Sequence, residues 1–193
     1  MTGARARPRR ESFAERKERR AAVDDPAVVL EAAARFLEVR SRSVSEVRRR
    51  LGGAGYRADL VEGAIERMTE LGMLDDAAFA RAWVESRDRA RPRGERAIRD
   101  ELRLKGIDRT TIDAVVGERR DRAAATADDD ADGESVSADR ASAERLLAKH
   151  TRALDRVADP RQRRQRAYGL LARHGFDPET CREVAATVVV TEE

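Results

Sequence analysis

The sequence predicts an all-α protein built from tandem three-helix bundles, and three observations support this fold class. Helix-favouring Ala, Arg, Glu and Leu dominate, whereas the 193 residues include only 12 Gly and 5 Pro, too few turn residues for many short strands. Hydrophobic residues make up 40% of the chain and recur at regular spacing. One helix-ending motif occurs three times. We therefore expect about nine helices in three units that form an elongated, curved array, and we exclude an all-β sandwich or barrel.

Residues 1–26 are predicted to form a basic, disordered arm. The first 22 residues contain eight Arg or Lys side chains against three Glu. Phe13 and Val23 are almost the only large apolar residues in this part of the chain. Such a segment buries too little apolar surface to offset the entropy lost on ordering.

The repeated motif consists of Leu, three further residues, Gly and a large apolar residue. It occurs at Leu51–Tyr56, Leu102–Ile107 and Leu171–Phe176. Glycine supplies the left-handed residue that ends many helices, and the apolar residue after it packs back on the last turn. Each motif therefore predicts the C-terminus of a helix.

Apolar residues continue in register on both sides of each motif. Positions five, eight and nine after the motif match one face of a helix: Val61, Ala64, Ile65; Ile112, Val115, Val116; and Cys181, Val184, Ala185. Four residues before each motif stand Val47, Ile98 and Ala167. A further helix precedes this pair in each unit, with apolar residues Leu30, Ala33, Leu37; Phe79, Trp83; and Leu146, Leu147, Leu154.

Helix-start signals and composition divide the chain. Either Ser43 or Ser45 is an expected N-cap, and so is Asp177, which Pro178 follows at the first helical position. The predicted units cover residues 27–73, 74–122 and 139–193. Between the last two lies an acidic stretch, 123–138, with little to bury, which we expect to be a flexible insertion. We expect Trp83 to be largely buried, so that Trp83→Ala costs about 3 to 5 kcal/mol.

Several classes of function are disfavoured by what the sequence contains. The longest apolar run, Val184–Val190, is far shorter than the ~20 residues of a membrane span, and no apolar stretch follows the basic N-terminus as in a secretory signal. The single cysteine, Cys181, fits a reducing cytoplasm. His150 and His174 lack a ligand cluster at metal spacing, so we expect surface histidines and no metal.

No catalytic motif stands out either. The glycines of residues 52–55 follow a helical pattern and not a strand, so we interpret them as a helix end and not as a phosphate-binding turn. Cys181 falls on an apolar helix face, which is typical of a buried structural thiol. We therefore predict no enzyme and no cofactor.

Arginine clusters are the candidate binding residues. An anionic partner, either a phosphate backbone or an acidic protein surface, would fit two runs that appear least neutralised by neighbouring acids. These are Arg87, Arg89, Arg91, Arg93, Arg96, Arg99 and Arg103, and separately Arg161, Arg163, Arg164 and Arg166. Solvated helix faces are the alternative explanation. Aromatic residues do not interleave with the arginines, so base stacking is not expected.

The sequence resembles the RecX family, the bacterial regulatory proteins that modulate the RecA recombinase. In the first unit, Arg40–Leu51 is similar to the family pattern R-x-x-S-x-x-E-L-x-x-x-L. The second unit contributes Gly72–Ala80, followed by Arg87, Gly94, Ile98, Glu101, Leu102, Lys105, Gly106 and Ile107. The resemblance covers residues 27–120 well and 139–190 weakly. The basic arm and the acidic insertion depart from the family pattern.

The resemblance implies a non-enzymatic regulator that binds the RecA–DNA filament. It implies tandem three-helix repeats and inhibition of RecA ATP hydrolysis, strand exchange and coprotease activity in DNA repair, recombination and the SOS response. Basic faces could add contacts to single- or double-stranded DNA, and we expect a monomer. Two alternatives stay open: a helical module that acts directly on DNA, and a purely structural scaffold. Against the first, the repeats lack a distinct recognition helix with base-reading side chains.

Overall fold

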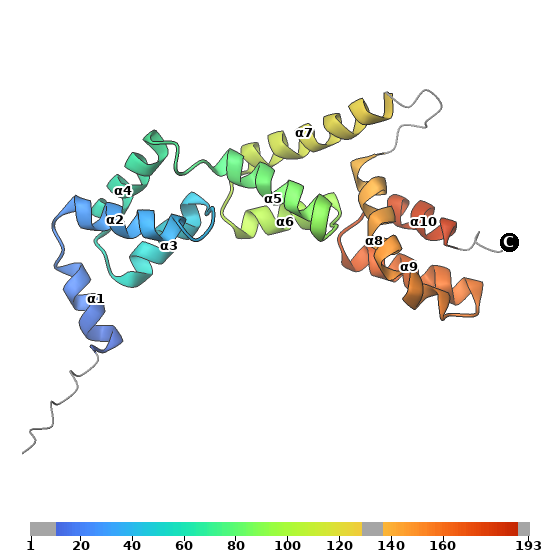
Figure 1. Cartoon of the computed structure of the whole chain (residues 1–193), viewed down its shortest axis with the longest axis horizontal. Coiled ribbons are helices and arrows are strands. Elements are labelled where there is room, and N and C mark those ends of the chain that lie inside the picture. The colour runs from blue at the N-terminus through green and yellow to red at the C-terminus, as the bar shows by residue number, and fades with distance from the viewer. Residues whose placement is uncertain (1–10, 129–136, 189–193) are drawn as a thin grey trace, which may run out of the picture. The chain divides into compact units, whose positions relative to one another are not determined.

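The computed structural model describes residues 11–128 and 137–188, and all regular structure in these ranges is helical (Figure 1). The ten described helices belong to two compact units, residues 1–75 and 76–193. This confirms the predicted all-α class, with one more helix than the nine expected. The additional helix lies in the N-terminal arm.

The first unit contains one three-helix bundle. It is formed by α2 (Pro26–Leu37), α3 (Val44–Ala54) and α4 (Ala58–Glu70). The three helices enclose an apolar core, to which they contribute Val29, Ala33, Val47, Leu51, Val61, Ala64, Ile65 and Met68. Of the two serines expected as caps, Ser43 and not Ser45 caps α3, by accepting a hydrogen bond from the Glu46 amide (3.2 Å).

The predicted disorder of the whole 1–26 arm is wrong for residues 13–21, which form α1 (Phe13–Ala21). A capping box starts this helix: Ser12 accepts from the Glu15 amide, and Glu15 accepts from the Ser12 amide. Arg20 donates to the Ala54 carbonyl at the end of α3 (3.4 Å). The cap and this contact stabilise a short helix that composition alone does not predict. Residues 1–10 lie outside the described residues.

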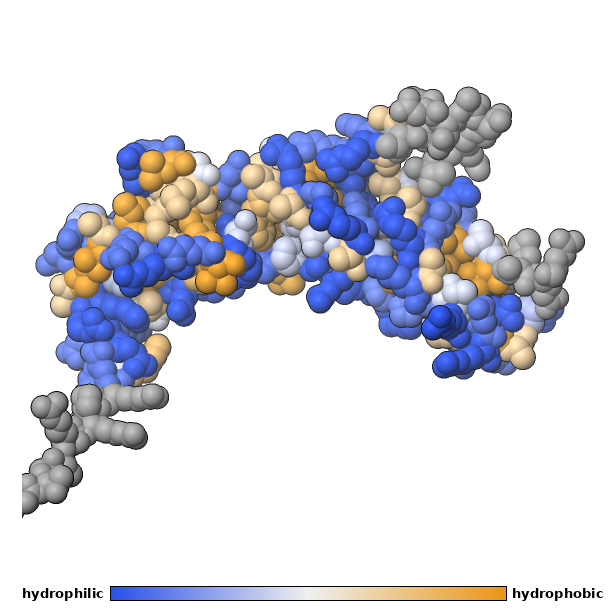
Figure 2. Space-filling view, in the orientation of Figure 1, coloured by the Kyte–Doolittle hydropathy of each residue, from blue (hydrophilic) through white to orange (hydrophobic). Residues whose placement is uncertain are grey.

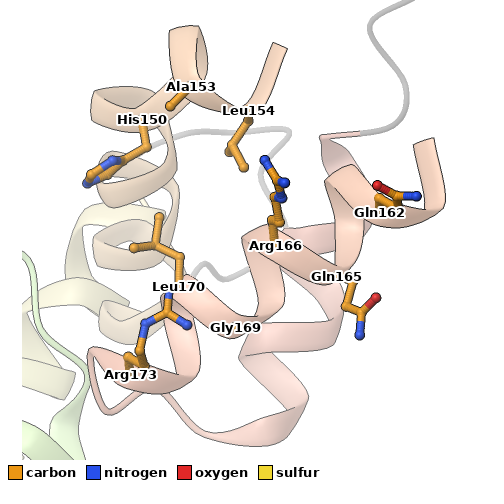
Figure 3. Close-up of a pocket in the computed structure, with 9 residues that line it drawn as sticks. All are labelled: His150, Ala153, Leu154, Gln162, Gln165, Arg166, Gly169, Leu170 and Arg173. Atoms are coloured by element: carbon orange, nitrogen blue, oxygen red, sulfur yellow. The ribbon is translucent and has the colours of Figure 1, made fainter. Parts of the chain in front are cut away.

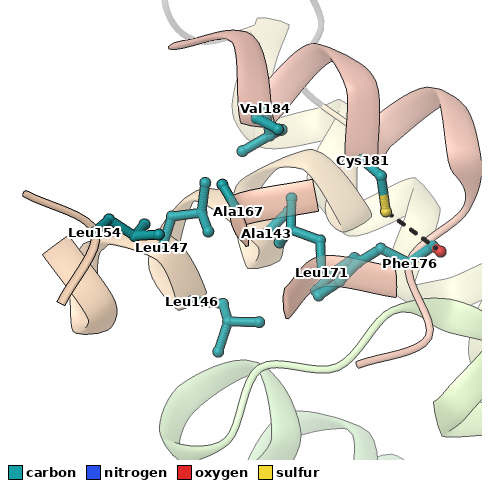
Figure 4. Close-up of a cluster of buried hydrophobic side chains, with 10 residues drawn as sticks. Ala143, Leu146, Leu147, Leu154, Ala167, Leu171, Phe176, Cys181 and Val184 are labelled. Carbon is teal, nitrogen blue, oxygen red and sulfur yellow. Dashed lines mark hydrogen bonds between the residues drawn. The ribbon is translucent and has the colours of Figure 1, made fainter. Parts of the chain in front are cut away.

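The second unit contains two bundles in sequence. Its helices are α5 (Asp76–Ala90), α6 (Glu95–Leu104), α7 (Arg109–Asp128), α8 (Ala138–Asp155), α9 (Pro160–Arg173) and α10 (Pro178–Thr187). Helices α5, α6 and α7 enclose one apolar core, and α8, α9 and α10 enclose another. Figure 4 shows the second of these cores, where Leu146, Leu171, Phe176 and Val184 pack together.

The repeated glycine motif ends α3, α6 and α9 as predicted. Gly55, Gly106 and Gly175 have φ angles of 104°, 79° and 82°, in the region that favours glycine. In each motif the amide of the final apolar residue donates to the carbonyl of the first Leu, at 3.3 Å, 3.1 Å and 3.4 Å. This 6→1 bond defines a Schellman cap.

The apolar faces predicted on either side of each motif are confirmed in all three bundles, whereas Leu30 and Leu37 of the preceding helix are half-buried. Every residue expected five, eight or nine positions after a motif is buried, and so are the residues expected before each motif. The single thiol follows the same pattern: Cys181 is fully buried, and its Sγ lies 3.6 Å from the Phe176 carbonyl (Figure 4). Burial raises the pKa of this thiol, as expected for a structural cysteine and not for a nucleophile.

The acidic stretch does not begin as a loop. Helix α7 continues to Asp128, so residues 123–128 are helical, which corrects the predicted flexible insertion over 123–138. Ala residues dominate this part of α7, and Ala is the strongest helix former. Residues 129–136, which complete the predicted insertion, lie outside the described residues.

Trp83 is half-buried and not largely buried as predicted. Its neighbours Ala80 and Val84 fill the core positions, and the indole lies at the margin of the core. The indole Nε1 donates to Glu101 (2.8 Å), and the cationic groups of Arg87 and Lys105 lie 4.2 Å and 4.8 Å from the ring centroid. Ala80 and Val84 are four residues apart and share the innermost face of α5, so Trp83 lies beside this face and not on it.

This position changes the expected cost of truncating Trp83. We expect Trp83→Ala to lower the free energy of unfolding by about 2 kcal/mol, below the range for fully buried aromatic residues, because half of the ring already contacts solvent or cations. Urea denaturation followed by far-UV circular dichroism measures the change. Trp83→Phe is the control, since it keeps a ring over the core and removes only the Nε1 donor. A loss as large as that of a core truncation would contradict the half-buried placement.

Candidate functional site

Two adjoining cavities in the second unit form the candidate site, which we call the basic groove. The larger, about 780 Å³, lies between α8 and α9 and is lined by His150, Ala153, Leu154, Gln162, Gln165, Arg166, Gly169, Leu170 and Arg173 (Figure 3). The smaller, about 270 Å³, is lined by Ala90, Arg91, Pro92, Arg93, Leu146, Lys149, His150 and His174. His150 lines both cavities, which therefore adjoin each other.

The charge of the basic groove has one sign. Five cationic side chains line it, namely Arg91, Arg93, Lys149, Arg166 and Arg173, and none of the described residues that line it is acidic. Within the described part of the chain, the guanidinium groups of Arg91, Arg166 and Arg173 form no hydrogen bond or ion pair. Uncompensated positive charge in a concave surface attracts anions.

Helix α9 supplies most of the polar lining of the larger cavity. Arg166 and Arg173 are seven residues apart, so they lie on one face of the helix. Figure 3 shows Arg166 extending toward Leu154 of α8, with Gln162 at the far end of the same cavity. Glutamine amides both donate and accept hydrogen bonds without adding charge. Hydrophilic residues also dominate the visible surface of α8 and α9 (Figure 2).

The loop between α5 and α6 brings two further arginines to the groove. The Gly94 amide donates to the His174 carbonyl (3.1 Å), and the Lys149 ammonium donates to the Ala90 carbonyl (2.8 Å). These bonds hold the loop against the third bundle, so that Arg91 and Arg93 line the smaller cavity. The groove is therefore built by two bundles within one compact unit.

A buried arginine joins the same two bundles behind the groove. Arg119 of α7 has a side chain that is only 3% exposed. Its guanidinium donates to Asp88 of α5 at 2.9 Å, to Asp139 of α8 at 2.6 Å and to Ser142 of α8 at 3.1 Å. Ser142 in turn donates to Asp88 (2.9 Å). The second and third bundles are thus joined by a satisfied polar network.

The charges of this network respond to burial and to each other. Burial raises the pKa of the Asp139 carboxyl above its ordinary value, although the Glu95 amide and Arg119 act in the opposite direction. Burial also lowers the pKa of Arg119, but hydrogen bonds to Asp88 and Asp139 outweigh it, and the net pKa is raised. Arg119 therefore stays charged and requires both carboxylates as partners.

The seven predicted arginines of the second bundle separate onto different surfaces. Only Arg91 and Arg93 line the basic groove. A different cavity contains Arg96, Arg99 and Arg103, and its lining also includes Glu95, Asp100, Asp139 and Asp177. Arg99 pairs with Glu95 (2.8 Å) and with Asp113, and Arg103 pairs with Asp100 (2.6 Å). The expectation that this run is little neutralised is wrong, because Glu95 and Asp100 lie one turn away on α6 itself and Asp113 of α7 lies beside Arg99.

The remaining predicted arginines of this run are also paired. Arg87 donates to Glu101 at 2.6 Å, and Arg93 lies 3.6 Å from the same carboxylate. Arg89 pairs with Glu85, one turn earlier on α5. Glu101 also accepts from Trp83, so it is the centre of a local cluster on α5 and α6. Arg87 is therefore mainly a structural residue.

In the third bundle, the structure brings one predicted arginine into the groove. Arg166 lines it, whereas Arg161 and Arg164 are exposed outside its lining and Arg163 donates to the Val157 carbonyl (3.1 Å). Sequence reasoning missed the contributions of Lys149, Arg173, Gln162 and Gln165. Residues 161–173 contain no acid. The seven-residue spacing of Arg166 and Arg173 places both on one helix face, and this spacing could have identified Arg173 from the sequence.

The described residues offer no group of three or more His, Cys, Asp or Glu side chains placed to hold a metal ion. His150 is exposed, and His174 is half-buried with its Nδ1 2.8 Å from the Leu170 carbonyl. None of the helices in the described ranges is long and apolar enough to span a membrane. The groove is the feature of this part of the chain with the clearest binding chemistry.

Three tandem three-helix bundles define a helical-repeat protein. Comparison with known proteins gives the family. Models of the first, second and third three-helix domains of RecX match residues 30–68, 75–116 and 138–185. The chain belongs to the RecX family.

Individual relatives agree with this assignment. The Regulatory protein RecX of Mycolicibacterium vanbaalenii is 30% identical over 164 residues, which cover 82% of this chain and 80% of the relative. That of Mycobacterium avium is 30% identical over 158 residues, covering 82% and 83%. The crystal structure of RecX from Lactobacillus salivarius has the same fold, with a TM-score of 0.67 at 18% identity over 86% of this chain and 97% of that one.

Proposed function

We propose that this protein is a non-enzymatic regulator of the RecA recombinase that binds the RecA–DNA filament in the cytoplasm. Bound there, it inhibits ATP hydrolysis, strand exchange and coprotease activity during DNA repair and recombination. The observation that carries this proposal is the match of all three three-helix domains to the RecX family, whose curated relatives are named regulatory proteins.

The geometry of the second unit supports a binding role. Two bundles joined by the Arg119 network hold a groove of fixed charge pattern, which is a surface for recognition. Several weak contacts along tandem repeats sum to useful affinity when the partner is itself a repeating polymer. Inhibition then requires occupancy of the filament, and no chemical step by this chain.

Retention on filaments tests the proposal. We expect the full chain to be retained by RecA filaments assembled with ATP on immobilised single-stranded DNA more strongly than by the bare DNA. We also expect it to lower the steady-state rate of RecA ATP hydrolysis in proportion to occupancy. An unrelated helical protein of similar net charge is the control for nonspecific retention.

The alternative, a helical module that acts directly on DNA, gives a different result. Its retention on bare DNA would equal that on filaments, and RecA ATP hydrolysis would change only through competition for DNA. A purely structural scaffold would be retained by neither. The basic groove keeps the DNA-binding alternative open, because its charge suits a phosphate backbone as well as an acidic protein surface.

A further inference from the structure

We propose that the first bundle carries a docking site for an acidic peptide segment of a partner protein, where α2 passes into α3 (Figure 1). We call this site the α2–α3 corner and define it by Phe36, Val39, Arg42 and Arg50. It belongs to the first unit, whereas the basic groove belongs to the second. The site deepens the proposed function and rests on it only for the source of the acidic segment, the protein of the RecA filament.

Two guanidinium groups of the corner share one aromatic ring. The guanidinium carbon of Arg42 lies 4.2 Å from the centroid of the Phe36 ring, and that of Arg50 lies 5.7 Å from it. A cation–π contact holds an arginine in place without neutralising its charge. Two like charges beside one ring repel each other, and an anion near both relieves this repulsion. The ring therefore presents a pair of cations to carboxylates.

The positive charge of the corner is not compensated. Within the described part of the chain, Arg42 and Arg50 form no ion pair and no hydrogen bond through their guanidinium groups. Glu46 of α3 is bound elsewhere: its side chain is 13% exposed, and both carboxylate oxygens accept hydrogen bonds from Arg40 at 3.3 Å. A partner that supplies carboxylates would therefore meet two free cations.

Arg42 also has a donor that folding leaves without an acceptor. Its Nε is buried and has no hydrogen-bond partner among the described residues. Buried polar groups of this kind are rare, because an unsatisfied donor is unfavourable. A carboxylate accepts two parallel hydrogen bonds from one guanidinium group. When Arg42 turns outward to meet a carboxylate, its Nε therefore gains the acceptor that it lacks in the free protein.

The backbone of the corner is already held in position. Ser43 is fully buried and caps α3, and Arg40 pairs with Glu46 across the turn that contains Arg42. These contacts fix the connection between α2 and α3 on both sides of Arg42. Binding then has to order side chains only, which lowers its entropic cost.

The apolar part of the corner favours a peptide over a polynucleotide. Val39 is 78% exposed, and Phe36 is half-buried against the core of the bundle. Exposed apolar side chains beside cations suit a segment that carries both carboxylates and an apolar residue. A phosphodiester backbone has no apolar group to place against Val39. Base stacking on Phe36 is disfavoured as well, because two guanidinium groups already lie over its ring.

An NMR titration of the full chain tests the site. The probe is a short synthetic peptide with the repeat Glu-Glu-Leu, and the signals followed are the Nε–H groups of Arg42 and Arg50 and the amide of Val39. Affinity is taken from these signals alone, so binding elsewhere on the chain does not enter. Two comparison peptides replace Glu by Gln or Leu by Ser, and an oligothymidine replaces the peptide in a parallel titration.

We expect Arg50→Gln to weaken binding at the corner by about fivefold or more, because a charge-assisted hydrogen bond to carboxylate is lost. Arg49→Gln is the matched control: it removes the same charge from the adjacent exposed position of α3 and should weaken binding less than about twofold. Val39→Thr keeps the shape of the side chain but replaces a methyl group, and about a threefold loss is expected. Both comparison peptides should bind more weakly than the probe.

Three results would overturn the inference. The first is an equal loss in Arg49→Gln and Arg50→Gln. The second is unchanged affinity in Val39→Thr. The third is tighter binding of the oligothymidine than of the peptide at the same signals. Thermal melting checks that the variants fold, and Arg49, Arg50 and Val39 are exposed, so their substitution should leave the melting temperature unchanged.

Retention on filaments separates this inference from the proposed function. The titration contains no RecA, so its failure leaves the proposed function intact. Arg50→Gln should be retained by RecA filaments more weakly than Arg49→Gln, and equal retention would overturn the filament as the source of the acidic segment. Failure of the parent chain to bind filaments overturns the proposed function and leaves the peptide site standing.

Discussion

Arg119→Met is expected to lower the free energy of unfolding of the second unit by about 3 to 5 kcal/mol, the range for removing one partner from a buried ion pair. The substitution leaves Asp88 and Asp139 without their shared cation, with side chains only 25% and 15% exposed. Methionine fills a similar volume, so the loss measures the unpaired charges and not a cavity. Urea denaturation followed by far-UV circular dichroism gives the change.

Arg120→Met is the matched control for this experiment. Arg120 is adjacent in the sequence and pairs with Glu95, but its side chain is 62% exposed. An exposed ion pair contributes at most about 1 kcal/mol, so this variant should unfold almost like the parent. Equal behaviour of the two variants would show that Arg119 is not the residue that joins the two bundles.

Gly94→Ala is expected to cost about 3 kcal/mol, at the upper end for overpacking. A methyl group at this position would overlap with the backbone of Gly175 and Phe176, and backbone atoms cannot rotate away as a side chain does. The φ angle of Gly94 is −69°, which alanine adopts freely, so the effect is steric and not conformational. The Gly94–His174 hydrogen bond would lengthen at the same time.

Two glycine controls isolate this steric effect. Nothing lies within 4 Å of a Cβ placed on Gly117 in α7, so Gly117→Ala should be neutral or stabilise the helix by about 0.5 to 1 kcal/mol. Gly72 also has open space but a φ of 68°, so Gly72→Ala reports backbone strain without overlap. Melting temperatures compare the three variants. If the Gly94→Ala and Gly117→Ala proteins had the same melting temperature, this would contradict the close approach of Gly94 to the backbone of Gly175 and Phe176.

The fold could be predicted because each bundle repeats information that is local in sequence. A Leu, a Gly four residues later and an apolar residue after it specify one helix end and the face of the next helix. The structure confirms the caps at Gly55, Gly106 and Gly175 and the buried faces around them. Helix α1 was missed although Ser12 and Glu15 form a recognisable capping box, because composition was given more weight than this local signal.

The site could be predicted only in part, because charge pairing depends on contacts between distant segments. Arg99 pairs with Glu95, whose position one turn earlier can be read from the sequence, and also with Asp113 of the next helix, whose proximity cannot. Arg119 was not singled out, since no sequence pattern indicates that Asp88 and Asp139 lie on either side of it. Of the eleven arginines proposed from the sequence, Arg91, Arg93 and Arg166 line the basic groove.

The cap of α6 has a consequence for how this chain folds. Gly94 precedes this helix and has no side chain to accept its first amides, and Asp139 of α8 accepts the Glu95 amide instead, at 2.9 Å. One bundle thus completes a helix that belongs to another. In an array of repeats, the interactions between neighbouring repeats determine how cooperatively the array unfolds. We therefore expect the second bundle to gain its full stability during synthesis only after α8 has left the ribosome, and the last two repeats to unfold in a single cooperative transition.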